Sequence, residues 1–178
     1  MRAKFIVLVV LSLFLASCNA DEEKACEAVK NGALPDNASV YATEEIAIDA
    51  PVEKVWNLVT DIDHWPDWMA NVSDATLEGP LEVGSEFELV KAGLPGRSTL
   101  AIIEPNETFG WCGMTLEKIR IASIASAIIW RFEERQGITT VLLEESLEGS
   151  IVAAIYPSDK LAGDLKTRLL ELKTASEQ

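Results

Sequence analysis

Apolar side chains in the middle of the chain recur at two spacings, first that of a helix and then that of a strand. Residues 51–60 place apolar side chains three or four positions apart: Val52, Val55, Trp56 and Val59. This spacing predicts a short amphipathic helix with one apolar face. The helix is expected to end near Asp61, and Pro66 disfavours helical backbone at the residue before it. A second short helix or turn then holds three further apolar side chains: Trp65, Trp68 and Met69.

Strand-like segments surround these helices, one before them and six after. Turn residues separate the segments, among them Gly79-Pro80 and Gln136-Gly137. The expected strands cover residues 39–49, 74–79, 84–91, 97–104, 108–114, 119–133 and 138–148. Strands in this number, with two short helical segments after the first, predict an α+β fold built on one curved antiparallel sheet.

A final helix is expected over residues 158–174. Four leucines recur along it at helical spacing: Leu161, Leu165, Leu169 and Leu172. Charged residues, including Asp164 and Arg168, occupy its other sides. The helix is therefore amphipathic, and its leucine stripe is expected to cover the concave face of the sheet.

The segment from Ala50 to Phe87 carries three short motifs in succession. They are Ala-Pro-Val-Glu-Lys-Val-Trp from residue 50, Trp-Pro-Asp-Trp from residue 65 and Gly-Pro-Leu-Glu-Val-Gly from residue 79. The segment resembles the opening of a START-like (SRPBCC) domain of the polyketide cyclase/dehydrase and lipid-transport family. The resemblance extends over roughly residues 40–175. It implies a helix-grip fold, in which the curved sheet wraps around a long C-terminal helix and leaves an internal space for an apolar ligand.

The first seventeen residues predict an export signal. Arg2 and Lys4 precede an apolar run from Phe5 to Leu15, which is too short for a bilayer that needs roughly 20 apolar residues. The following Leu15-Ala16-Ser17-Cys18 resembles a bacterial lipobox, which implies that residues 1–17 are removed and Cys18 is lipidated. An ordinary secretory signal and an uncleaved anchor are the alternatives. Because Asn19 rather than Asp follows the cysteine, the resemblance implies the periplasmic face of the outer membrane.

The mature chain is expected to comprise an acidic tether over residues 18–38 and a single START-like domain over residues 39–178. A short helix over residues 22–30 is an alternative within the tether. The full chain carries a net charge of −14, and removal of Arg2 and Lys4 makes the mature protein more acidic still. Such a surface repels nucleic acid and anionic lipid headgroups, so nucleic acid is not expected as a partner and membrane contact is assigned to the lipid anchor.

Cys26 and Cys112 leave two interpretations open. In an oxidising compartment they are able to form a disulfide that closes a loop of more than 80 residues. Alternatively, Cys112 is a small buried strand residue and Cys26 lies in the tether. The cysteine spacing and the single histidine do not fit a metal site, and no cofactor is expected.

Strand alternation predicts which side chains line the internal space. Ile128, Trp130 and Phe132 share one strand face, Phe109 and Trp111 share another, and the C-terminal leucines close the space from the opposite side. The expected ligand-binding residues are Trp65, Trp68, Met69, Phe87, Trp111, Ile128, Trp130, Phe132, Leu161, Leu165 and Leu169. The alternative is that these side chains simply fill a solid core.

Candidates for acid–base chemistry are few, and no catalytic residue is assigned. His64 lies in a polar segment where an exposed side chain is the ordinary outcome. Glu144 and Glu145 point to opposite faces of their strand, so one of them can enter the concave side. Burial there would raise the pKa of its carboxyl group and suit it to act as an acid or base. The alternative, which is the more usual outcome, is that the strand twists outward near its end and both carboxylates remain solvated.

The sequence therefore favours a lipid-anchored envelope protein that binds or carries a hydrophobic small molecule, such as a lipid or a polyketide-like compound. A cyclase/dehydrase-like enzyme on the same fold is one alternative, less favoured because its acid–base groups are scarce. The other is a non-catalytic envelope protein with a packed core and a protein partner that the sequence does not identify.

Overall fold

The computed structural model describes residues 20–36, 38–115 and 123–178. Within these ranges the chain forms a seven-stranded sheet in the order β1-β7-β6-β5-β4-β3-β2, with every neighbouring pair antiparallel. The strands are β1 (Val40–Ile48), β2 (Val72–Glu78), β3 (Glu86–Lys91), β4 (Leu94–Glu104), β5 (Thr108–Thr115), β6 (Ile124–Arg135) and β7 (Ile138–Glu148). The helical elements are α2 (Val52–Thr60), the 3₁₀ turn η1 (Ile62–His64), α3 (Trp65–Trp68), α4 (Val152–Ile155) and α5 (Ser158–Ser176).

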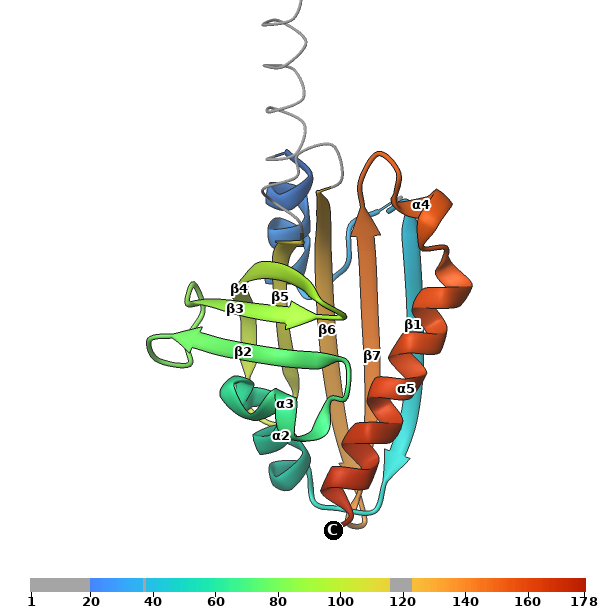
Figure 1. The fold of residues 1–178 in the computed structure, drawn as a ribbon. Helices are drawn as coiled ribbons and strands as arrows, with labels where there is room; N and C mark the ends of the chain where they lie inside the picture. The colour runs from blue at the N-terminus through green and yellow to red at the C-terminus, as the bar shows by residue number, and fades with distance from the viewer. Residues whose placement is uncertain (1–19, 37, 116–122) are drawn as a thin grey trace, which may run out of the picture.

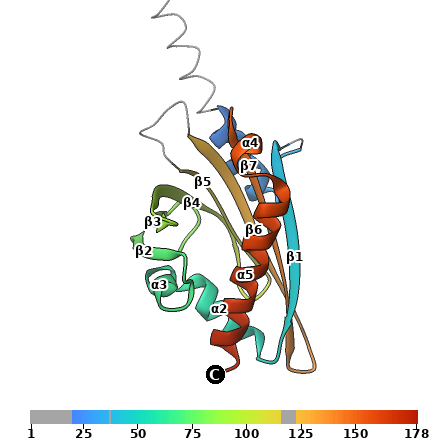
Figure 2. The same ribbon diagram turned by 45° about the vertical axis from the view of Figure 1, so that its right-hand side comes forward.

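The sheet is curved, and its concave side faces α5 (Figure 1). Strand β4 shifts its pairing with β5 between Leu100 and Ile102, and a bulge of this kind bends a strand and increases its twist. On the far side of β4, strands β3 and β2 fold forward over the concave side, opposite α5 (Figure 2). The predicted α+β helix-grip fold is thereby confirmed, with the two short helices after the first strand. Residues 119–122 of the predicted sixth strand lie outside the described residues.

The core on the concave side is built by the alternation that the sequence predicts. Ile128, Trp130 and Phe132 of β6 belong to it, whereas Ile129 points to the opposite face. Aromatic rings connect along this side from Phe132 through Trp56 and Phe109 to Trp111, Trp65 and Phe87. The ring centroids in this series lie 5.2–5.9 Å apart, within the range of favourable aromatic pairs.

The convex face is covered by the N-terminal part of the described chain. Residues 20–30 are helical and bury Ala25 and Val29 against the sheet. The facing sheet residues are Ala101, Cys112, Ala127 and Ile129. Gly110 allows this close approach, because a Cβ atom there would lie 3.0 Å from Val29 Cγ1 and 2.8 Å from the carbonyl oxygen of Ile128.

The structure also joins Cys26 of this helix to Cys112 of β5 by a disulfide. Residues 20–30 therefore belong to the folded body, whereas the sequence analysis expected mainly a solvated tether with a short helix as the alternative. The physical reason is that Ala25, Cys26 and Val29 form a narrow apolar stripe, which small sheet residues accommodate. The predicted signal peptide and Cys18 lie outside the described residues. Among the described helices, none is long and apolar enough to cross a membrane.

Candidate ligand cavity

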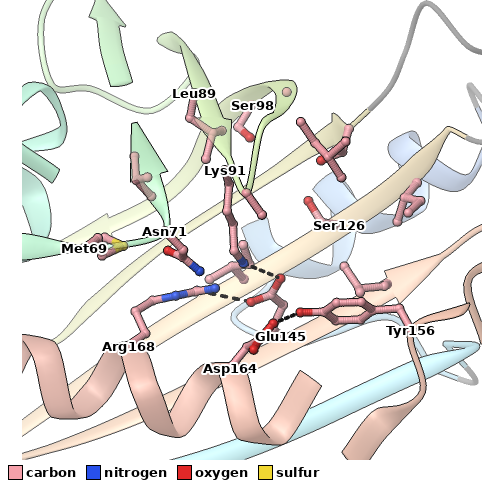
Figure 3. Close-up of a pocket in the computed structure, with 18 of the residues that line it drawn as sticks. Met69, Asn71, Leu89, Lys91, Ser98, Ser126, Glu145, Tyr156, Asp164 and Arg168 are labelled. Atoms are coloured by element: carbon pink, nitrogen blue, oxygen red, sulfur yellow. Dashed lines mark hydrogen bonds and ion pairs between the residues drawn. The ribbon is translucent and has the colours of Figure 1, made fainter. Parts of the chain in front are cut away.

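A cavity of about 260 Å³ lies between the concave face of the sheet and the N-terminal half of α5. Its apolar lining comes from Trp65, Met69, Val72, Leu89, Leu94, Trp111, Ile124, Ile128 and Leu147. Its polar lining includes Asn71, Lys91, Glu145, Tyr156, Lys160, Asp164 and Arg168, several of which Figure 3 shows meeting above β6 and β7. The cavity is therefore amphipathic, with aromatic and aliphatic walls and one charged region.

Small inward-facing residues create this space. Strand β6 carries Phe132 and Trp130 on its inward face at one end, but Ser126 on the same face farther along. Strand β4 likewise changes from Leu100 to Ser98 and then to Gly96, and the last two line the cavity. Because side chains in a packed core fill nearly all the available volume, this loss of side-chain volume leaves room next to α5.

The eleven side chains predicted from sequence to bind a ligand divide into two groups. Four of them line the cavity: Trp65, Met69, Trp111 and Ile128. Six are core residues that do not line it: Phe87, Trp130, Phe132, Leu161, Leu165 and Leu169. Trp68 is half-buried and lines a separate surface groove beside the C-terminal half of α5. For the six core residues the solid-core alternative fits better, and Trp68 fits neither interpretation. Ligand binding by the other four stays a prediction.

Three charged side chains from three separate elements meet at the polar end. Glu145 on β7 lies between Lys91 at the end of β3 and Arg168 on α5 (Figure 3). Its Oε1 atom is 3.9 Å from Lys91 Nζ, and its Oε2 atom is 3.2 Å from Arg168 Nη1. The side chains of Glu145 and Arg168 are only 5% and 4% exposed, while that of Lys91 keeps 26% of its surface accessible. This is a buried ion cluster that opens into the cavity.

The pKa values in this cluster follow from burial and from the neighbouring charges. Burial raises the pKa of Glu145, but the positive charges of Lys91 and Arg168 outweigh it, so the pKa is lower than that of an ordinary glutamate. Burial lowers the pKa of Lys91, and the charge of Arg168 lowers it further. Of the two outcomes that the sequence left open, solvation of both carboxylates is wrong for Glu145, which is buried. The raised pKa expected for a buried carboxylate is also not found, because two cations lie beside Glu145. An ionised Glu145 is poorly suited to act as a general acid.

A second set of polar groups lies near the start of α5. Tyr156 Oη donates a hydrogen bond to Asp164 Oδ2, and Lys160 Nζ lies 4.5 Å from the centre of the Tyr156 ring. Lys160, Asp164 and Arg168 are spaced four residues apart, so they form one helical stripe beside the stripe of leucines that packs on the sheet. Helical spacing predicted Asp164 and Arg168 on the other sides of the helix, but both line the cavity and Arg168 is buried.

The remaining acid–base candidates lie away from the cavity. His64 is exposed, and its Nδ1 atom is 2.9 Å from Asp61 Oδ1, a hydrogen bond that raises the pKa of the imidazole. Glu144 accepts a hydrogen bond of 3.0 Å from Arg131 Nε. Glu144 therefore does not share the cavity with Glu145, as strand alternation requires.

Lys91 and Arg168 were not predicted as cavity residues, although local signals in the sequence pointed to both. Lys91 follows Phe87 and Leu89 at two-residue spacing, so it continues their inward face. Arg168 lies three residues after Leu165 and four before Leu172, within reach of the apolar face of α5. In the described ranges, no group of three or more His, Cys, Asp or Glu residues is arranged to hold a metal ion.

The fold and the amphipathic interior define a START-like, helix-grip protein. The chain belongs to the family described as polyketide cyclase / dehydrase and lipid transport, whose model matches residues 39–177. Comparison of the sequence with curated proteins gives no significant match.

Solved structures with the same fold share little sequence with this chain. A hypothetical protein of Helicobacter pylori has a TM-score of 0.71 and 17% identity. The match covers 80% of this chain and 90% of the Helicobacter pylori chain. A Mesorhizobium loti protein has a TM-score of 0.63 and 16% identity, covering 76% and 95%. CalU16 from Micromonospora echinospora has a TM-score of 0.55 and 18% identity, covering 76% and 74%. At these identities the likeness concerns the fold alone.

Proposed function

We propose that this protein binds or carries a hydrophobic small molecule in the cavity between the sheet and α5. The observation that carries the proposal is the cavity itself, whose walls include the aromatic side chains of Trp65 and Trp111 together with Met69, Leu89 and Ile128. Ligand sites are usually concave, mostly apolar and supplied with a few placed polar groups. The family description, which includes lipid transport, supports the same interpretation.

The size of the cavity limits the ligand. At about 260 Å³ it lies just below the range of roughly 300–1,000 Å³ that is usual for pockets of drug-sized ligands. We therefore expect a single ring system or a short chain inside, with any longer portion extending through the open side.

Native mass spectrometry of the full chain, released from detergent after purification from cells, tests this proposal. We expect a discrete apolar adduct, or uptake of the neutral probe N-phenyl-1-naphthylamine by protein that carries none. The matched control is Ser126→Leu, which places a bulky side chain inside the cavity and should abolish uptake. An apo mass together with no probe uptake by the unaltered protein would contradict the proposal.

We also propose that the protein is exported and anchored through a lipid on Cys18, at the periplasmic face of the outer membrane. The lipobox-like Leu15-Ala16-Ser17-Cys18 supports this, as does the Cys26–Cys112 disulfide, since structural disulfides persist mainly in oxidising compartments. Replacement Cys18→Ser should remove the acyl mass from the mature protein and shift it from the membrane to the soluble fraction. An unchanged mass and distribution would contradict the anchor.

A further inference from the structure

The guanidinium group of Arg168, a residue that lines the cavity, has one buried hydrogen-bonding edge without a partner among the described residues. Its Nη1 atom faces Glu145, but Nε and Nη2 are buried without a hydrogen-bond partner in the described part of the chain. Buried polar atoms are nearly always paired, and an unpaired charged donor is costly. Nε and Nη2 lie on the same edge of the planar group, and such a pair of parallel N–H donors matches the two oxygens of a carboxylate.

The charges around this edge also favour the binding of an anion. Lys91 and Arg168 share the single carboxylate of Glu145, and Lys91 lies at 3.9 Å from it. The other carboxylate that lines the cavity, that of Asp164, accepts the Tyr156 hydroxyl and has Lys160 one turn away on α5. The charged lining therefore comprises three cations and two carboxylates, a positive centre within a chain whose net charge is −14.

The apolar wall begins next to this positive centre. Trp65, Met69, Leu89, Trp111 and Ile128 line the same cavity as Arg168. A molecule with one acidic end and one apolar end can therefore satisfy both walls at once.

We propose that the ligand is a monocarboxylate amphiphile, whose carboxylate is held side-on by Nε and Nη2 of Arg168 with Lys91 nearby, and whose apolar part lies against Trp65 and Trp111. This inference rests on the proposed function and specifies its ligand class. Glu145 then orients the guanidinium group through Nη1 while it competes with the ligand for positive charge.

A comparison of octanoate with 1-octanol tests the ligand class, because the two share a chain of eight carbons and differ in the head group. Octanoate and 1-octanol are each titrated into the full chain in the same detergent. The bound fraction is measured by native mass spectrometry. We expect octanoate to bind at least about tenfold more tightly than 1-octanol, the gain from one or more charge-assisted hydrogen bonds. Equal binding of the two would overturn the carboxylate inference and leave the proposed function intact. Binding of neither probe, with no uptake of N-phenyl-1-naphthylamine, would overturn the proposed function as well.

Two variants at the site shift octanoate binding in opposite directions. Arg168→Lys keeps the charge but loses the planar pair of donors, so octanoate should bind about tenfold more weakly while 1-octanol binding stays unchanged. Glu145→Gln removes the competing carboxylate, so octanoate should bind more tightly, an outcome that loss of structure does not produce. Lys166→Gln, on the exposed side of α5, is the matched control and should change neither. Unchanged octanoate binding in Arg168→Lys, or weaker octanoate binding in a folded Glu145→Gln variant, would overturn the assignment.

Discussion

The two ends of the concave side differ in packing: one is filled by aromatic rings and the other contains the cavity. At the end near α2, Trp56 packs edge-on against Phe109 and Phe132, with centroid distances of 5.9 and 5.5 Å. At the other end, the inward positions of β6 and of the neighbouring β4 carry Ser126 and Ser98, and the space beside them holds charged side chains. A continuous sheet can therefore form both a solid core and a cavity, because the size of the inward residues changes along its strands.

The difference extends to the energetics of the two ends. The packed end buries apolar rings, each worth a few kcal/mol. The open end buries Glu145 and Arg168 with incomplete hydrogen bonding, an arrangement that is costly in the absence of a partner. The packed end therefore contributes stability that offsets the cost of the unpaired polar atoms at the open end.

The largest expected effect on the free energy of unfolding comes from removing an aromatic ring from the packed end. Phe109→Ala should lower the free energy of unfolding by about 4 kcal/mol, because Phe109 is fully buried between Trp56 and Trp111 and a cavity would replace its ring. Urea denaturation measures the change. Ile138→Ala, at a side chain that is 46% exposed, is the control and should cost less than about 1 kcal/mol. A loss at Phe109 as small as that of the control would mean that this end is not tightly packed.

The next effect comes from breaking the ion cluster at the open end. Glu145→Gln should lower the free energy of unfolding by about 3 kcal/mol at pH 7, since it leaves Arg168 and Lys91 without their shared carboxylate. The double variant Glu145→Gln with Arg168→Gln should lose less than the sum of the two single changes. Strict additivity in this double-mutant cycle would show that the two groups do not interact.

Acid pH should reproduce part of that loss in the unaltered protein. The pKa of Glu145 is lower in the folded state than in the unfolded chain, so its contribution is complete above the unfolded pKa and disappears as the pH falls through the folded pKa. Denaturation curves from pH 7 to pH 3 should therefore show the stability gap between wild type and Glu145→Gln narrowing, by at most about 1.4 kcal/mol per pH unit. Lys91 and Arg168, the two cations beside Glu145, are present in both proteins, so the gap reports the Glu145 carboxyl group together with its coupling to them. A gap that is constant with pH would contradict the assigned shift.

The smallest effect on stability is expected from filling the open end. Ser126→Leu places an apolar side chain in existing space, so the free energy of unfolding should change by less than about 1 kcal/mol while uptake of the apolar probe is lost. Ser73→Leu, on the exposed face of β2, is the matched control and should retain uptake. Severe destabilisation by Ser126→Leu would show that this end is as tightly packed as the other.

Local patterns in the sequence predicted much of this arrangement. Two-residue alternation correctly separated Ile128, Trp130 and Phe132 from Ile129, and helical spacing identified α2 and α5. The motifs from residue 50 to residue 84 indicated the family, which the match over residues 39–177 confirms. Of the candidate site, the sequence predicted Trp65, Met69, Trp111 and Ile128 as lining residues, but it assigned the same role to side chains that fill the core.

The amino-acid sequence by itself determined the order of the strands and of helices α2 and α5, and the inward or outward direction of side chains along the strands, because these depend on spacings of two to four residues along one backbone. Only the tertiary structure decided that Lys91, Glu145 and Arg168 meet at one place, and that residues 20–30 cover the convex face. These contacts join segments far apart in the chain, and they depend on the bend of β4 and on the volumes of side chains from several strands. The periodicity of one segment carries no information about the distance to another.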